Sequence, residues 1–139
     1  MILLDVGVWL AAVHGNHVRH PQVAHWFDSA TDQLAFCRIT QNGLLRLLTN
    51  SAALGPDVCT RSQAWSVLDG LRSDERVIWV DEPPGTEAAF RALSAKNDTS
   101  HKLWTDDYLA AFAQVADAEF ATLDHKIAAR YPSVRVRTL

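Results

Sequence analysis

The sequence is poor in cysteine and carries no excess of positive charge. Its 139 residues include two cysteines, Cys37 and Cys59, which form neither a C-x-x-C pair nor another zinc-binding spacing. The formal net charge is −3, from 13 Lys and Arg against 16 Asp and Glu. A nucleic-acid-binding protein of this charge would need a local basic patch or a metal ion to hold phosphate.

Long apolar runs and nucleotide-binding glycine motifs are also absent. The apolar start MILLDVGVWLAAV lacks a preceding basic segment, contains Asp5 and is too short to span a bilayer. Neither a P-loop nor a G-x-G-x-x-G motif is present, which disfavours enzymes that use nucleotide cofactors. We therefore expect a cytoplasmic protein without a membrane segment, in which both thiols stay reduced.

What the sequence does contain is enough apolar material for a folded core. Hydrophobic residues make up 48% of the chain, and there are five Trp and five Phe. This composition argues against disorder, and no repeat or low-complexity tract interrupts it. The length is typical of one domain, so we expect residues 1–139 to form a single one.

Short apolar segments alternate with amphipathic ones along the whole chain. The segments expected to be strands are residues 2–4, 34–37, 77–80, 119–123 and 134–136. The expected helices are 6–13, 20–30, 41–48, a helix from residue 60 or 62 to about 71, 86–94, 105–116 and 125–130. Thr40 is expected to cap the third helix, and residues 50–60 to form a loop. The alternation predicts an α/β fold: a three-layer α/β/α sandwich around a mostly parallel sheet of about five short strands.

Three aspartates stand at comparable points of this pattern. Asp5 ends the first strand, Asp124 follows the strand 119–123, and Asp106 lies in the first turn of the helix 105–116. In a parallel α/β sheet, strand ends and the starts of neighbouring helices share one edge, where ligands bind. Each aspartate alone is most simply a cap or turn residue. Together they predict a cluster of carboxylates.

Clustered carboxylates require a counter-charge. Two of them about 4 Å apart repel by several kcal/mol at an effective dielectric near 20, unless a cation or a proton intervenes. Hard divalent cations such as Mg²⁺ or Mn²⁺ prefer such oxygen-rich sites. An ion held there can orient a water and offset charge on a phosphodiester, so the pattern favours metal-dependent phosphoryl chemistry.

Four histidines, His14, His17, His20 and His25, suggest a zinc site at first sight. Gly15 and Asn16 interrupt the helix between the first two, and Pro21 is typical of a new helix start. We therefore expect surface and capping roles for these histidines.

Four segments in order resemble the PIN-domain family of VapC-type toxins. They are MILLDVGVWLAA, ITQNGLLRLLTN, TDDYLAAFAQ and FATLDHKI, and the similarity extends over nearly the whole chain. The resemblance implies a PIN-like fold and a metal-dependent endoribonuclease that cleaves structured RNA, such as tRNA or ribosomal RNA. It also implies a homodimer that is held inactive by a cognate antitoxin.

Position by position, Asp5, Asp106 and Asp124 match three acids of the family. The resemblance implies that these aspartates bind Mg²⁺ or Mn²⁺ and form the catalytic site together with Gln41. Gln41 stands where the family commonly has Glu, and Gly7 where it commonly has Asn. Gln41 can still offer an oxygen or hydrogen-bond a water, but three acids should hold a metal ion more weakly than four.

One further acid and three arginines near these motifs each admit more than one role. Asp107 could compensate for the missing acid, although its place beside Asp106 on a helix points it partly away. Arg46, Arg135 and Arg137 could contact the RNA backbone, but solvent exposure or pairing with an antitoxin would explain them equally well.

Two alternatives remain open. The departures at Gln41 and Gly7 favour a weakened or inactive nuclease that mainly binds an antitoxin, and through it DNA. The same α/β scaffold could instead carry a phosphoryl-aspartate receiver or a small metal-dependent phosphatase. A receiver would need a paired acid near its first strand and a lysine before its last helix, and neither is evident.

Overall fold

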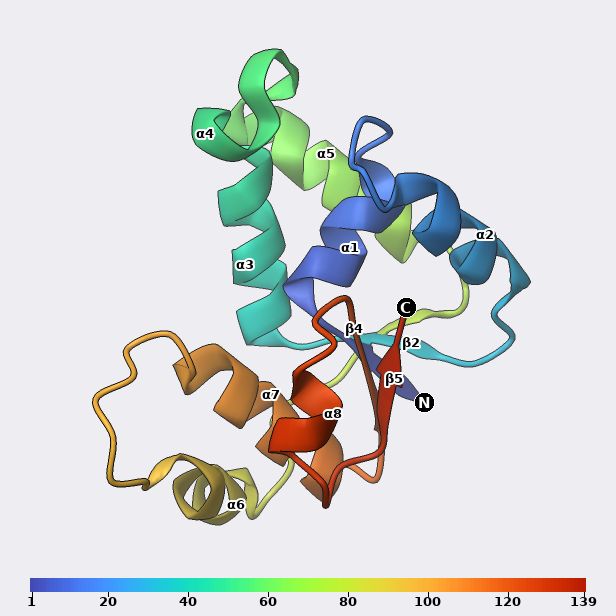
Figure 1. The fold of residues 1–139 in the computed structure, drawn as a ribbon. Helices are drawn as coiled ribbons and strands as arrows, with labels where there is room; N and C mark the ends of the chain where they lie inside the picture. The colour runs from blue at the N-terminus through green and yellow to red at the C-terminus, as the bar shows by residue number, and fades with distance from the viewer.

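A computed structural model describes all residues, 1–139, and contains one parallel sheet. Its five strands lie in the order β3-β2-β1-β4-β5, and Figure 1 shows β2, β4 and β5 at the centre of the molecule. Every neighbouring pair of strands is parallel, as the alternating pattern predicted. The strands are β1 (Ile2–Leu4), β2 (Leu34–Phe36), β3 (Val77–Trp79), β4 (Glu119–Thr122) and β5 (Val136–Thr138).

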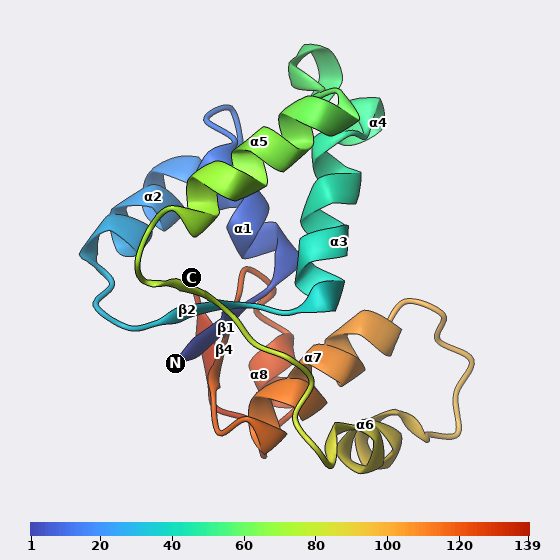
Figure 2. The ribbon, with the colours of Figure 1, turned by 180° about the vertical axis from the view of Figure 1, so that it is seen from behind.

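Helices cover both faces of the sheet, which confirms the three-layer α/β/α sandwich (Figures 1 and 2). One face carries α1 (Val6–Val13), α2 (His20–Ser29), α3 (Arg38–Leu48), α4 (Ser51–Leu54), the 3-10 helix η1 (Gly55–Asp57) and α5 (Arg61–Arg72). The other face carries α6 (Thr86–Ser94), α7 (Trp104–Val115) and α8 (Ile127–Arg130). None of these helices is long and apolar enough to cross a membrane.

Alternation along each strand divides the buried side chains into two cores. Ile2 and Leu4 of β1 pack into the core beneath α1, α3 and α5, whereas Leu3 packs into the core beneath α7. This division follows from the two-residue period of a strand, whose successive side chains point to opposite faces. In the first core, Trp9 stacks on Phe36 with ring centroids 3.7 Å apart.

Three local expectations are wrong, and the last helix, expected over residues 125–130, begins only at Ile127. Helix α3 begins at Arg38, because Cys37 is the N-cap and its N–H donates to Thr40 Oγ1, so Thr40 supports the cap from inside the helix. Residues 50–60 are not a plain loop: Asn50 caps α4, and η1 follows. The last strand is Val136–Thr138, two residues later than expected. The N–H of Val134 donates to the carbonyl of Tyr131 in a turn, so Val134 does not join the sheet.

The sheet order reverses between β1 and β4. From β1 the chain continues outward through β2 and β3, and the later strands β4 and β5 extend the sheet on the other side. The N–H of Asp5 donates to the carbonyl of Ala121 across this boundary, at 2.9 Å. In open α/β sheets, the crevice beyond the carboxyl ends of strands at such a reversal is the usual ligand site.

Helices α1 and α3 approach each other closely at Gly43. A Cβ atom at Gly43 would lie 2.4 Å from Cγ2, 3.0 Å from Cγ1 and 3.3 Å from Cβ of Val6. Rotating the Val6 side chain cannot relieve all three contacts, so the two helices would have to separate. Val6 follows Asp5, and the strain would therefore reach the edge of the sheet described above.

We predict that Gly43→Ala destabilises the protein by about 1–3 kcal/mol, the usual effect of overpacking. The matched control is Gly70→Ala in α5, where a Cβ would meet no atom within 4 Å. That control should be neutral or stabilising by up to about 1 kcal/mol, through helix propensity. Urea unfolding measures both variants, and equal midpoints for them would refute the close approach.

Candidate active site

Asp5 is held in place at the end of β1 by two hydrogen bonds. Its Oδ1 accepts the N–H of Val6 at 2.7 Å, which makes Asp5 the N-cap of α1. Its Oδ2 accepts the hydroxyl of Thr122, the last residue of β4, at 2.9 Å. The carboxylate is thus fixed by the start of its own helix and by the neighbouring strand.

Asp124 lies two residues beyond the end of β4 and is exposed. Its N–H donates to Thr122 Oγ1 at 3.2 Å, and its Oδ1 accepts the N–H of Lys126 at 2.8 Å. The fully buried Thr122 hydroxyl therefore connects Asp5 with Asp124. The T-x-D spacing in the sequence is the signal that could have pointed to this threonine.

Asp106, the third residue of α7, belongs to the same site. The pKa of Asp106 is raised to about 6, first by burial and then by the charges of Asp5, Asp124 and Asp107, against which the charge of Arg130 acts. Burial also raises the pKa of Asp5; hydrogen bonds from Thr122 and Val6 lower it, and the charge of Asp124 adds to the rise. In the structure, Asp5, Asp106 and Asp124 therefore lie near enough for their charges to affect one another's pKa.

Arg130 is a member of this site that sequence reasoning missed. It ends the short helix α8, and its Nη1 lies 3.4 Å from Asp106 Oδ2. Both side chains are about 30% exposed, at 31% and 28%. Nothing in the sequence marks this arginine, because the contact depends on how α8 packs against α7.

Asp107 faces away from the cluster. It is 7% exposed, and its Oδ1 accepts the hydroxyl of Tyr131. Burial raises the pKa of Tyr131, and the Asp107 carboxylate adds to the rise. The suggestion that Asp107 compensates for a missing acid therefore finds no support in its contacts.

Gln41 is buried and already engaged by an arginine. Its Oε1 accepts Nη1 of Arg38 at 2.7 Å, and the Arg38 guanidinium lies 4.5 Å from the ring centroid of Trp79. The amide nitrogen of Gln41 remains available as a donor. At Gly7, an added Cβ would make an ordinary 3.9 Å contact with Leu123, so the backbone leaves room for a side chain there.

The three arginines suggested for RNA contact lie in different surroundings. Exposed Arg46 lines a cavity of about 550 Å³ together with Val6 and Thr105, the chain neighbours of Asp5 and Asp106. Arg135 pairs with Asp117 at 2.9 Å, and Arg137 pairs with Glu119 at 2.8 Å. Asp117 lies just before β4 and Glu119 is its first residue, so both are at the end of the strand opposite Asp124. Only Arg46 therefore borders the candidate site.

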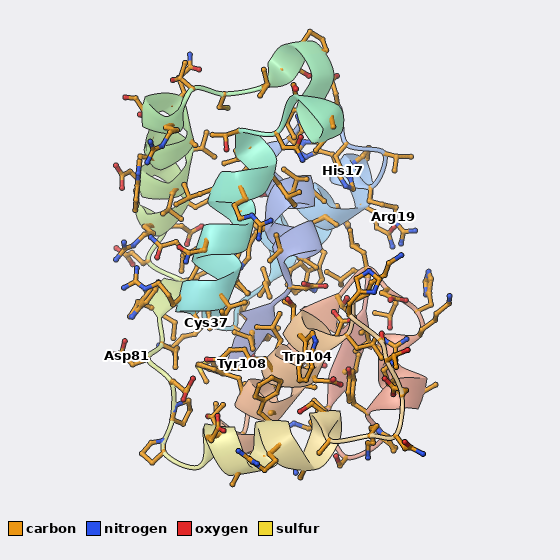
Figure 3. The ribbon with its side chains drawn as sticks, turned by 90° about the vertical axis from the view of Figure 1, so that its left-hand side faces the viewer. His17, Arg19, Cys37, Asp81, Trp104 and Tyr108 are labelled. Atoms are coloured by element: carbon orange, nitrogen blue, oxygen red, sulfur yellow. The ribbon has the colours of Figure 1, made fainter.

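His14, His17 and His20 lie around the turn between α1 and α2, and His25 lies on the exposed surface within α2. His17 Nδ1 accepts the N–H of Arg19 at 3.0 Å, and His20 Nδ1–H donates to the carbonyl of Ala11 at 2.6 Å. Figure 3 shows His17 and Arg19 together in this turn, far from Tyr108 of α7. The contacts are with backbone atoms, as in capping and turn roles.

The carboxylates fit a hard divalent cation by their chemistry. They are oxygen donors, each keeps lone pairs beyond its present hydrogen bonds, and they repel one another as the pKa of Asp106 shows. As placed, no three His, Cys, Asp or Glu side chains are close enough to hold one ion jointly. Binding would require these acids to draw together, which a shared cation favours.

Comparison with known sequences identifies relatives over the whole chain. The family model described as PIN domain matches residues 2–132. The chain is 37% identical to Ribonuclease VapC41 of Mycobacterium tuberculosis, covering 100% of this chain and 99% of the relative. It is 31% identical to Ribonuclease VapC29 of the same species, covering 97% and 94%.

Solved structures share the fold at lower identity. The VapBC2 complex of Rickettsia felis, bound to a promoter DNA fragment, has a TM-score of 0.70 at 17% identity and covers 100% of this chain and 99% of its own. VapC20 of Mycobacterium tuberculosis, described as a sarcin-ricin loop cleaving toxin, has a TM-score of 0.71 at 13% identity, covering 93% and 94%. The family model and the full-length relatives together show that this chain belongs to the PIN-domain family and is of the VapC type.

Proposed function

We propose that this protein is a metal-dependent endoribonuclease that hydrolyses phosphodiester bonds in structured RNA, such as tRNA or ribosomal RNA. The observation that carries the proposal is that the charges of Asp5 and Asp124 act on Asp106 at the point where the sheet order reverses. The 37% identity to a VapC ribonuclease over the full chain supports it.

In this proposal, Asp5, Asp106 and Asp124 hold one Mg²⁺ or Mn²⁺. When bound, such an ion lowers the pKa of a coordinated water and offsets charge on the phosphodiester. Thr122 and the Val6 N–H fix the orientation of Asp5, and the Arg130 guanidinium orients Asp106. Gln41, with its oxygen held by Arg38, presents amide N–H groups that can orient a water or a phosphate oxygen.

RNA would reach the acids along the cavity lined by Val6, Arg46 and Thr105. Arg46 forms no ion pair in the structure, so its charge is available to the RNA backbone. With a net charge of −3, the protein has no general attraction for RNA, and a local cation matters more.

We further propose that the protein is the toxin of a toxin–antitoxin pair, acts as a homodimer and is neutralised by a cognate antitoxin. The VapC relatives and the VapBC complexes with the same fold support this part of the proposal.

A second candidate is a weakened PIN domain that serves mainly to bind the antitoxin. Two observations favour it: the uncharged Gln41 is held by Arg38, and the acids need to move before they can share an ion. Calorimetric titration with Mn²⁺ separates the candidates, because a protein without nuclease activity of this kind should show no saturable binding.

We predict that Asp5→Ala abolishes both RNA cleavage and the growth arrest caused by expression of the protein. Loss of a carboxylate fixed by Val6 and Thr122 should lower the cleavage rate at least about 100-fold in saturating Mn²⁺. The control is Asp69→Ala, an exposed change on α5 that should leave cleavage unchanged. Cleavage by Asp5→Ala at the parental rate would remove Asp5 from the site.

The raised pKa of Asp106 predicts that metal binding weakens in mild acid. With a pKa of about 6, Asp106 is mostly ionised at pH 7 and mostly protonated at pH 5, and a proton excludes the cation. Calorimetry should therefore give a Mn²⁺ affinity at least about tenfold lower at pH 5 than at pH 7.

The same shift has the opposite effect on the metal-free fold. Because the folded-state pKa exceeds the unfolded value of 3.8, protonation of Asp106 stabilises the folded protein as pH falls from 7 towards 4. Asp106→Asn should raise the melting temperature at pH 7 by a few degrees and should lack this part of the pH dependence. An unchanged melting temperature would mean that neither burial nor the neighbouring acids disfavour the charge of Asp106.

A fourth carboxylate should strengthen the site. We predict that Gln41→Glu tightens Mn²⁺ binding several-fold and speeds RNA cleavage, because it adds a charged oxygen ligand. Gln63→Glu in α5 is the control, since Gln63 only caps its own helix there. If Gln41→Glu leaves the Mn²⁺ affinity unchanged, Arg38 retains the new carboxylate and position 41 is not part of the metal site.

A further inference from the structure

A second hollow lies between α6, α7 and the end of α8, where Arg130 lines it. The connection 95–103 leaves α6 and arches outward before it enters α7 (Figures 1 and 2). Beneath it lies a cavity of about 540 Å³, here called the loop cavity. Residues that line it and enter the argument below are Lys96, Asp98, Thr99, Ser100, His101, Trp104, Asp107 and Arg130.

The loop cavity adjoins the proposed catalytic site through Arg130. This arginine lines the cavity, and its Nη1 is also 3.4 Å from Asp106 Oδ2. Asp107, the next residue after Asp106, forms part of the same wall. Arg130 is therefore the side chain that the loop cavity and the acids have in common.

Trp104 gives the loop cavity an aromatic wall. Trp104 is the first residue of α7 and is 56% exposed. Its ring packs edge-to-face on Phe90, with the ring centroids 6.1 Å apart. Phe90 also contacts Tyr108, and Figure 3 shows Trp104 and Tyr108 projecting from the same helix. The ring is thus supported on one side and open on another, as a stacking platform for a base requires.

The charges around the loop cavity suit a neutral ring better than a phosphate. Lys96 and Arg130 are balanced by Asp98 and Asp107. Both acids are already hydrogen-bonded, Asp98 by the N–H of Ser100 and Asp107 by the hydroxyl of Tyr131. A phosphate would need a surplus of positive charge, whereas the edges of a base need donors and acceptors such as Thr99, Ser100 and His101.

We propose that the loop cavity is a nucleobase subsite, in which Trp104 stacks on an unpaired base beside the scissile phosphate. The proposal rests on the proposed nuclease function and deepens it by assigning the place, and the aromatic side chain, that would receive an unpaired base. Bases within a duplex cannot enter, because they are stacked and paired.

The test compares two exposed tryptophans. Trp65 is 48% exposed but lies on α5, on the opposite face of the sheet, so Trp65→Ala is the matched control for Trp104→Ala. The probes are a labelled hairpin RNA with a randomised unpaired loop and a blunt duplex of the same stem. Binding is measured by fluorescence anisotropy with Mn²⁺ in an Asp5→Asn background, which should not cut the RNA.

Trp104→Ala should weaken binding of the hairpin about tenfold or more, and leave duplex binding unchanged. Trp104→Phe should restore most of the affinity, because it restores a stacking face. Thr99→Trp, which fills the loop cavity but keeps Trp104, should cause a similar loss. Replacing one loop nucleotide of a selected hairpin by an abasic residue should lower the affinity of the parent but not that of Trp104→Ala.

Several results would overturn the subsite. If Trp104→Ala and Trp65→Ala bind the hairpin with equal affinity, the subsite is refuted and the nuclease proposal stands. The same holds if Trp104→Ala loses equal affinity for the hairpin and the duplex. A loss of antitoxin binding alone would assign the surface to a protein partner instead. If the parent protein cleaves no RNA in Mn²⁺, the nuclease proposal fails, and the subsite fails with it.

Discussion

The parallel pairing of β1 with β4 is the constraint on which the candidate site depends. These strands are far apart in the sequence, yet their pairing places Asp5 beside the end of β4. The Thr122 hydroxyl then donates to Asp5 and accepts from the N–H of Asp124, so one buried side chain fixes the relation between two acids. Because the sheet order reverses at this boundary, no crossover helix fills the space beyond the strand ends.

Acids whose charges disfavour one another's ionisation must be offset by something else in the fold. Hydrogen bonds to Asp5 and the nearby Arg130 offset part of the negative charge, but burial and the neighbouring acids still raise the pKa of Asp106 to about 6. The protein therefore keeps its acids in a state that favours either a proton or a cation. Such a site stabilises the fold poorly by itself, and this is expected where residues serve binding or chemistry rather than packing.

Periodicity predicted the sheet, both helical layers and the position of most elements, because strand and helix patterns are local properties of the chain. The errors have local causes as well. Thr40 was expected as a cap, but its hydroxyl also suits the N3 position behind Cys37. Residues 50–60 contain Gly55 and Pro56, which are typical of loops, yet Asn50 caps a short helix there. Arg135 and Arg137 could not be placed from the sequence, since their partners Asp117 and Glu119 come from the adjacent strand and the turn before it.

The sequence by itself determined that Asp5, Asp106 and Asp124 occupy strand ends and a helix start, because these positions follow from local pattern and motif. It also determined the family, through segments that match along the full length. Only the tertiary structure decided which other groups meet these acids. Arg130 pairs with Asp106, Arg38 donates a hydrogen bond to Gln41, and Tyr131 donates one to Asp107. The connection 95–103 covers a cavity that Arg130 also lines. Each of these contacts joins elements whose spacing in the chain carries no signal, since side-chain packing between helices sets them.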